Sequence, residues 1–172
     1  MSSFRYVAWI WHRDIESQRH CAQAISSRLQ TSQASSWNVG LVREGLSVFY
    51  TGGHPGAVAC YPLPNEAGVV LGTVFLRRAA GSGAASGSSA FTGDANQGEY
   101  ILSSDGRWLI DACWGRYVAL FCDAGGHSFR VLRDPSGSLS CLLTTFEGLT
   151  FVFSHPEDAL RLGVLKPSIN WR

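Results

Sequence analysis

Short apolar segments separated by turn residues make up most of the chain, and one amphipathic segment near the amino terminus interrupts them. Positions 4–11 are aromatic and β-branched, which predicts a strand buried on at least one face. Apolar residues at helical spacing then run from Ile15 to Leu29, and Asp14 stands where a helix cap is needed. The pattern predicts a helix that ends in the polar stretch 30–38.

Beyond residue 41 the helical spacing disappears, and apolar runs alternate with turn residues, which predicts strands. The runs in the middle of the chain are 46–50, 58–61 and 69–76. The runs in the last third, which we expect to form one antiparallel meander, are 114–122, 128–133, 140–145 and 149–154. Between the two groups, residues 79–98 are rich in glycine and small polar residues, which indicates a flexible loop.

Two local signals near the end of the chain help to define the fold class. Asp134, Pro135 and Gly137 match the residue preferences of a type I turn. Residues 156–162 predict a short helix that stops near Gly163. The order of strand, helix, many strands and short helix implies an α+β fold. We expect a single domain over residues 1–172, with layered antiparallel sheets and flanking helices.

Composition narrows the possible partners. Fourteen basic and thirteen acidic residues leave a net charge of +1, and no run of like charges occurs, so neither nucleic acid nor an anionic membrane is an expected partner. No apolar run approaches the roughly 20 residues that cross a bilayer, and the amino terminus lacks a secretory signal pattern. We therefore expect a cytoplasmic protein.

The cysteines and histidines give no sign of a metal site. The five cysteines are an odd number without C-x-x-C spacing, and the five histidines are scattered singly. Reduced, mostly buried thiols are the expected state of the cysteines.

Three segments together resemble the glutaminase-type amino-terminal domain of asparagine synthetases. In that family a strand with a Gly-x-aromatic start is followed by Arg-Asp-x-x-Gly, then by a strand ending in Ser and a short helix. The resemblance covers residues 111–160, and its core residues are Trp114, Gly115, Arg116, Tyr117, Arg133, Asp134, Pro135 and Gly137. This variant resembles the asparagine-synthetase-like proteins that close the macrolactam ring of lasso peptides. The resemblance implies an αββα sandwich of the amino-terminal-nucleophile hydrolase type, or a reduced form of it.

The catalytic groups of active relatives are largely missing. The resemblance implies a nucleophilic cysteine where this chain has Ser2, and an arginine clamp where it has the stretch 31–36. The oxyanion asparagine would fall at Leu71, beside Gly72. Asp94 stands where relatives place the carboxylate that binds the glutamine amine. Gly72 and Asp94 are thus the candidate binding positions, Ser2 is the remaining candidate nucleophile, and glutamine hydrolysis is expected to be lost.

The ATP-using half of the family is also missing from these residues, because no Ser-Gly-Gly-x-Asp-Ser loop occurs. We expect no cofactor in this chain, with ATP and Mg²⁺ belonging to a synthetase domain that acts with it in cis or in trans. The chain is then a structural domain of an amide-forming ligase, whose further partner would be a precursor peptide. Residues 156–162 and 165–171 are the expected docking face.

Two alternatives remain open at this level. One is an amino-terminal-nucleophile amidohydrolase that uses Ser2, and the other is a peptide-binding module in which tryptophans line a groove.

Overall fold

The computed structural model describes residues 4–31, 37–52, 60–77, 91–123 and 128–166. Ser2, the stretch 79–90 and the segment 167–172, all of which carry sequence-based expectations, lie outside these ranges. The chain divides into two compact units, the first formed by residues 1–54 and 140–172 and the second by residues 55–139.

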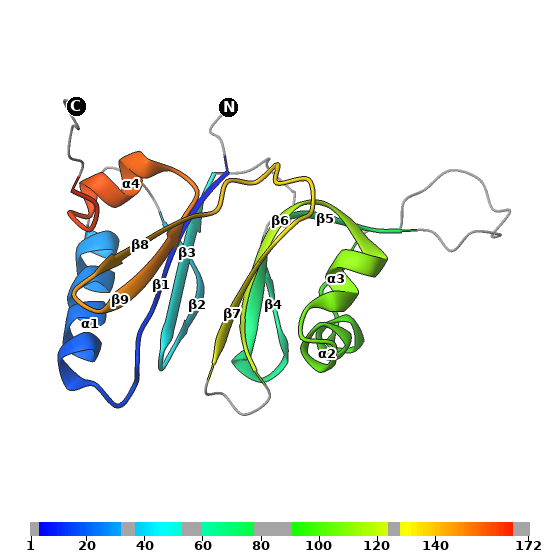
Figure 1. The fold of residues 1–172 in the computed structure, drawn as a ribbon, viewed down its shortest axis with the longest axis horizontal. Helices are drawn as coiled ribbons and strands as arrows, with labels where there is room; N and C mark the ends of the chain where they lie inside the picture. Colours follow the sequence, from blue (N-terminus) through cyan, green and yellow to red (C-terminus); the bar gives the residue numbers. More distant parts are fainter. Residues whose placement is uncertain (1–3, 32–36, 53–59, 78–90, 124–127, 167–172) are drawn as a thin grey trace, which may run out of the picture. The chain divides into compact units, whose positions relative to one another are not determined.

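A five-stranded antiparallel sheet forms the first unit, with the strand order β2-β3-β1-β9-β8 (Figure 1). Its strands are β1 (Arg5–Ile10), β2 (Asn38–Arg43), β3 (Leu46–Thr51), β8 (Leu142–Phe146) and β9 (Leu149–Phe153). The helices α1 (Glu16–Thr31) and α4 (Pro156–Arg161) belong to the same unit. The central strand β1 pairs with β3 on one side and with β9 on the other.

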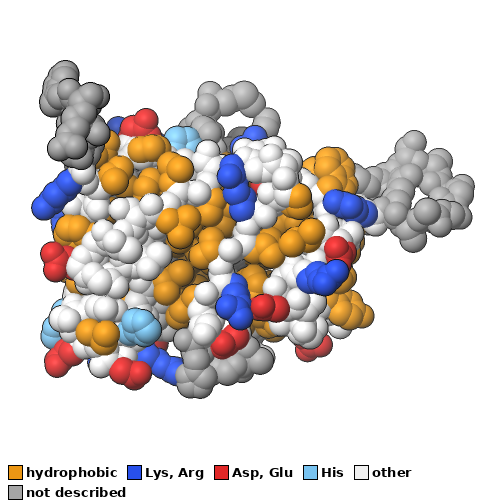
Figure 2. All heavy atoms as spheres, in the orientation of Figure 1, with side chains coloured by type: hydrophobic (Ala, Val, Ile, Leu, Met, Phe, Trp, Pro, Cys, Tyr) orange, Lys and Arg blue, Asp and Glu red, His pale blue; other side chains and the backbone are white. Residues whose placement is uncertain are grey.

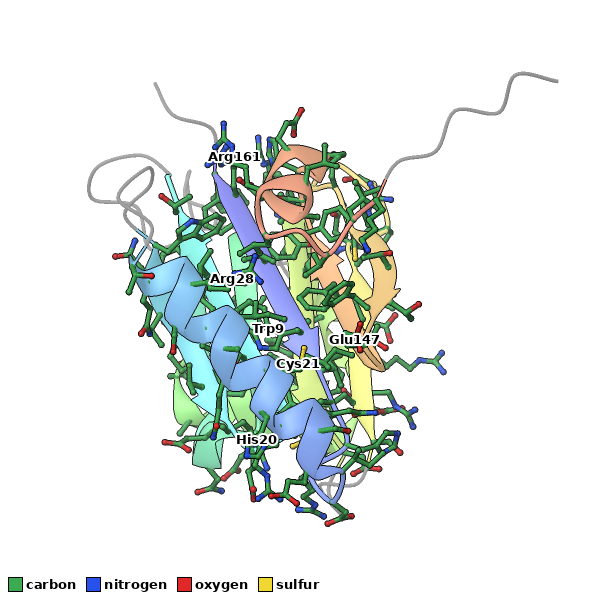
Figure 3. The ribbon with its side chains drawn as sticks, turned by 90° about the vertical axis from the view of Figure 1, so that its left-hand side faces the viewer. Trp9, His20, Cys21, Arg28, Glu147 and Arg161 are labelled. Carbon is green, nitrogen blue, oxygen red and sulfur yellow. The ribbon has the colours of Figure 1, made fainter. Side chains whose placement is uncertain are left out.

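Helix α1 lies across this sheet because its apolar stripe covers a cluster of aromatic side chains (Figure 3). Ala22, Ile25 and Leu29 are the buried residues of the helix, as the spacing predicts. Beneath them Trp9 stacks on Phe49, with 5.2 Å between the ring centroids. Ile15, where we expected the stripe to begin, precedes the helix and is 42% exposed.

The second unit is built on a four-stranded antiparallel sheet with the order β4-β5-β6-β7. Its elements are β4 (Cys60–Pro62), the 3₁₀ turn η1 (Pro64–Glu66), β5 (Gly68–Leu76), α2 (Ala95–Ser103), α3 (Arg107–Ala112), β6 (Cys113–Cys122) and β7 (Phe129–Arg133). The helices α2 and α3 lie on one side of this sheet (Figure 1). Ile101 and Leu109 from these helices pack with Val70, Tyr117 and Phe121 from the strands.

The expected four-stranded meander is wrong. Strands β6 and β7 pair in one sheet, whereas β8 and β9 pair in the other. The turn at 134–137 does not close a hairpin between β7 and β8, and the Arg133 guanidinium donates to the carbonyls of Gly137 and Leu139 in the segment that follows. Strand β8 begins only at Leu142.

Three elements were not predicted from the pattern. Strand β2 escapes notice because a bulge between Val39 and Leu41 breaks its alternation. The last residues of the expected loop 79–98 form the first turn of α2, and α3 follows it. Gly98 lies inside α2 because a Cβ there would stand 2.2 Å from Pro64 Cδ, so the helix approaches η1 closely only with glycine.

The fold class is α+β with two antiparallel sheets and few helices, as expected in its coarse form. The helix at 156–162 is confirmed as α4, and Gly163 follows it with a positive φ of 74°. Within the described ranges, no helix combines the length and the apolar character that crossing a bilayer requires.

Candidate functional site

The strand that carries the first half of the motif, β6, has exposed residues only near its start and is buried from Tyr117 to Cys122. Trp114 is 49% exposed and stacks on Phe75, with 4.6 Å between the ring centroids. Arg116 is also exposed, and within the described part of the chain it has no ion pair or side-chain hydrogen bond. Tyr117 is fully buried, and its hydroxyl donates to the Leu109 carbonyl at 2.8 Å. Burial raises the pKa of this phenol, so it remains protonated and holds α3 against the sheet.

Two glycines let β5 and β6 come together at the motif. Gly115 has a φ of +140°, and a Cβ there would stand 2.2 Å from the Thr73 carbonyl oxygen. Gly72, a candidate binding position, has a φ of +108°, and its Cβ would stand 2.3 Å from the Arg116 carbonyl oxygen. Both distances are far shorter than a real Cβ atom tolerates. Gly72 is therefore needed for the close pairing of β5 with β6.

The second half of the motif forms the turn that follows β7. The Gly137 N–H donates to the Asp134 carbonyl at 3.0 Å, which is the hydrogen bond expected of the predicted type I turn. Asp134 is only 3% exposed, and its N–H donates to the Tyr117 carbonyl at 3.0 Å. Its carboxylate accepts from the Ser136 hydroxyl through Oδ1, whereas Oδ2 is buried without a partner among the described residues.

Arg133 completes the turn from the strand side. Its Nε donates to the Leu139 carbonyl at 2.9 Å, and its Nη2 donates to the Gly137 carbonyl. A single guanidinium thus satisfies two carbonyls of the segment that leaves the sheet. Arg133, Asp134 and Gly137 therefore act in folding, with Pro135 exposed at the corner of the turn.

Asp94, the other candidate binding residue, is the N-cap of α2. Its carboxylate accepts from the Gln97 N–H at 2.9 Å and from the Thr92 hydroxyl at 3.0 Å. The Gln97 side chain in turn accepts from the Gly93 N–H at 2.9 Å. This is a variant of the capping box, because Gly93 is the residue before the N-cap. The hydrogen bond from Gln97, followed by that from Thr92, lowers the pKa of Asp94. The Asp94 carboxylate is thus engaged in hydrogen bonds at the amino terminus of α2, which it stabilises.

The structure brings together only part of the expected site. Gly72 pairs directly with Tyr117, so the β5 position and the motif strand are neighbours, and the turn is attached to Tyr117 through Asp134. Asp94 caps a separate helix of the same unit. Leu71 is fully buried and has no donor to offer an oxyanion. Ser2 and the clamp positions 32–36 lie outside the described residues.

A polar cluster that the sequence analysis missed lies where β9 ends in the first unit. The Ser154 hydroxyl accepts from the Tyr6 N–H at 3.0 Å and lies 2.9 Å from His155 Nδ1. Asp158, 3% exposed, stands 3.4 Å from the Arg5 guanidinium. This cluster resembles a nucleophile beside a base, but Ser154 is only 4% exposed and its oxygen completes the backbone pairing of β1. The contacts of this cluster connect β1 to the end of β9 and to α4.

Most apolar side chains of the described part of the expected docking face are buried within the first unit. Ala159, Leu162 and Val164 are buried in the core beneath α1, and Leu165 packs against them. Leu160, the one large apolar residue of α4, is 43% exposed. The buried apolar residues of α4 and of the segment after it thus belong to the core of the first unit.

The cysteines are free thiols throughout the described residues. Burial raises the pKa of Cys60 and of Cys113 to about 11, so neither is a thiolate at neutral pH. Cys21, on α1 in Figure 3, has its pKa raised by burial and then by Glu147, against a smaller lowering by Arg28. Within the described ranges, no three His, Cys, Asp or Glu side chains are grouped as a metal site requires.

No protein-family model, curated protein or solved structure matches the chain. The interpretation of the site therefore depends on the residues themselves.

Gly72→Ala should destabilise the second unit strongly. A side chain at positive φ and a 2.3 Å approach to a backbone oxygen together cost about 2–6 kcal/mol in the free energy of unfolding. Gly137→Ala is the matched control, because its nearest neighbour is the Arg133 side chain at 3.1 Å and the cost is about 1–2 kcal/mol of backbone strain. Denaturant unfolding curves measure both, and equal losses would contradict the close approach of β5 and β6.

The stability of the first unit should depend on pH through Asp158. Burial raises the pKa of this carboxyl above its ordinary value of 3.8, and this effect outweighs the lowering by Arg5, His155 and Arg161. Because the unfolded carboxyl ionises at lower pH than the folded one, its ionisation costs the folded state stability. The free energy of unfolding of the native chain, minus that of Asp158→Asn, should fall as pH rises from 3.8 through the raised pKa.

Denaturant unfolding of the two proteins across that pH range provides the measurement. The quantity to compare is the change of this free-energy difference with pH. Its absolute value is less informative, because the substitution also removes the ion pair with Arg5 at every pH at which that pair exists. Asp111→Asn is the control, because the Asp111 side chain is 65% exposed. The difference in the free energy of unfolding between the native chain and this variant should not change with pH. A difference that rises with pH would show that the pairing with Arg5 outweighs burial.

Proposed function

We propose that the chain is a catalytically degenerate glutaminase-like domain of an asparagine-synthetase-related, ATP-dependent amide-forming protein of the lasso-peptide cyclase type, and that it serves as a structural domain. The α+β architecture with two antiparallel sheets is compatible with the αββα sandwich that the resemblance implies. The motif strand and the Arg133–Gly137 turn are joined by the hydrogen bond from Asp134 to Tyr117. The proposal thus treats the motif as a folding unit retained from active relatives.

The loss of catalysis in this proposal follows from what now occupies the matched positions. Leu71, where an oxyanion donor would stand, is fully buried and apolar. Asp94, where a carboxylate would bind the glutamine amine, is the cap of α2 and accepts two hydrogen bonds there. Neither position offers a free group for glutamine, which favours a structural role over hydrolysis.

One observation carries the idea of a partner. Within the motif, Gly115, Tyr117, Arg133, Asp134 and Gly137 each have a contact that explains them through folding. Within the described residues Arg116 has no such contact, and Trp114 is 49% exposed although one side of its ring stacks on Phe75. The two side chains lie two residues apart on the same face of β6.

The exposed residues of the motif are those that a partner domain would contact. Tryptophan and arginine are the side chains most often found at the centre of protein interfaces. The partner in this proposal is the synthetase domain, which would bind ATP and Mg²⁺ and act on a precursor peptide. Basic and acidic side chains are interspersed on the face drawn in Figure 2, which gives no support to a nucleic-acid partner.

The purified chain should release no ammonia from glutamine above the buffer rate. An oxyanion donor alone is worth about 100 to 1000-fold in rate, and the position of that donor is held by Leu71. An enzyme-coupled ammonia assay checks this result, with Ser2→Ala as the comparison. Steady release that disappears in Ser2→Ala would replace the structural role with an amino-terminal-nucleophile amidohydrolase.

Trp114→Ala and Arg116→Ala should each weaken binding to the synthetase domain encoded in the same or a neighbouring reading frame. We expect a loss of about tenfold or more in affinity for the tryptophan, because truncated interface hot spots cost at least about 2 kcal/mol. Tyr100→Ala is the matched control, since Tyr100 is 56% exposed and stacked on Trp108 but lies outside the motif. Calorimetric titration measures all three. Equal losses in the three variants, or no binding by the native chain, would contradict the proposal.

A further inference from the structure

Strand β8 is one edge of the sheet in the first unit, and this edge is unprotected (Figure 1). Its five residues include no charge and no proline, and its register with β9 contains no bulge. Leu143 is 60% exposed, the highest value among the exposed large apolar residues of the described structure. Natural sheet edges that stay free are blunted by charges, prolines, bulges or short length. Strand β8 is therefore open to pairing with another strand.

The other sheet edges of the described structure carry such protective features. Strand β2 has a bulge between Val39 and Leu41. Strand β4 has only three residues and ends in Pro62. Strand β7 bears Arg130 and Arg133. This contrast distinguishes β8 as the edge suited to an interface.

The hairpin turn after β8 determines which backbone groups of the strand face its open edge. The two turn residues, Glu147 and Gly148, have φ values of 50° and 79°, as in a type I′ turn. The strands on either side of the turn meet at Phe146 and Leu149. Residues that close such a two-residue turn are joined by backbone hydrogen bonds, so Phe146 directs its N–H and C=O toward β9.

The alternation of an antiparallel strand then assigns the remaining residues of β8. Every second residue directs its backbone groups to the same side, so Thr144 also bonds to β9. Leu143 and Thr145 therefore direct their N–H and C=O groups to the open edge. Within the described ranges, no backbone hydrogen bond beyond the sheet involves either residue. Their four groups form a pattern that another antiparallel strand can satisfy.

We propose that two copies of the chain pair through β8, antiparallel and about a two-fold axis at Thr144. Leu143 of each copy then lies opposite Thr145 of the other, and each such pair exchanges two backbone hydrogen bonds. The sheets of two first units thereby become one. The contact is isologous, so it closes at the dimer and leaves neither β8 edge open. The residues that carry the motif lie outside β8, which makes this contact independent of the proposed function.

The side chains around the axis favour a second copy as the occupant. Leu142, 40% exposed, falls opposite Phe146 of the second copy, and Phe146 packs against the core beneath α1. Pairing thus extends the apolar face that α1 covers. Glu147 is the only charged residue between positions 139 and 149, and it falls opposite the uncharged Cys141 of the second copy. Like charges opposite each other destabilise a strand pair, and this register has none.

The dimer is expected to be weak, because only a short strand from each copy takes part. Interfaces below about 1,200 Å² are typical of transient complexes. We expect a Kd of about 10–100 µM, so the full chain should be mostly dimeric at roughly 500 µM and monomeric at roughly 1 µM. Sedimentation equilibrium provides the measurement. A chain that is monomeric at both concentrations would overturn the proposal.

A lysine on each edge strand locates the contact. Leu143→Lys should weaken the dimer by about tenfold or more, because an edge lysine opposes strand pairing. Val39→Lys is the matched control, since Val39 is 54% exposed on β2, and it should leave the association unchanged. Denaturant unfolding confirms that both variants fold. Equal losses, or a loss in Val39→Lys alone, would show association through another surface and contradict the proposal.

Cross-linking tests the register. In the proposed pair the two Thr144 Cα atoms lie about 4.5 Å apart, which a disulfide can bridge. The two Thr145 residues are offset by two positions, so their Cα atoms lie about 8 Å apart, beyond that reach. Under mild oxidation Thr144→Cys should form a covalent dimer well above the background that the five native cysteines give, and Thr145→Cys should not. Equal yields from the two variants would refute this register.

Amide hydrogen exchange identifies the paired groups in the native chain. The N–H groups of Leu143 and Thr145 should exchange more slowly at roughly 500 µM than at roughly 1 µM, because they become paired in the dimer. The N–H of Thr144, already bonded to β9, should show no such change. Protection that appears in β2 rather than β8 would assign the dimer to the opposite edge and disprove the proposal.

Discussion

The pairing of β1 with β9 is the constraint on which the first unit depends. These strands lie at opposite ends of the described chain, and Val7 stands opposite Phe153 in the ladder. The Ser154 hydroxyl reinforces the junction by accepting from the Tyr6 N–H across 148 positions of sequence. Because β1 also pairs with β3, every other strand of this sheet is placed through it. The aromatic core under α1 forms only when both ends of the chain have met.

The elements that the sequence predicts well are those defined by local patterns. Strand β1, helix α1 and helix α4 each contain their own periodicity and end signals, so their bounds follow from a few neighbouring residues. The meander failed because strand pairing is a long-range property. Nothing in the local pattern of residues 114–154 indicates that β7 and β8 belong to different sheets, which only the pairing in the folded chain shows.

The candidate site shows the same division between local and distant information. The Asp134 to Gly137 turn was predictable from its composition, and its closing hydrogen bond is present. The capping box at Asp94 and Gln97 was also readable as a helix start, but the glycine-rich stretch before it suggested a loop. The cluster of Arg5, Ser154 and Asp158 was not predictable, since its members are brought together by the β1–β9 pairing.

The division of the chain has a consequence for its synthesis on the ribosome. Residues 55–139 form a compact unit whose sequence is complete before β8 begins at Leu142. Domains fold as units while synthesis proceeds, so this segment is able to collapse while β1 still lacks one of its two neighbours. Until residue 153 has emerged, the edge of β1 that β9 later occupies therefore has unpaired backbone N–H and C=O groups. Unpaired strand edges pair readily with other chains, so this edge is the part of the nascent first unit that most needs chaperone protection.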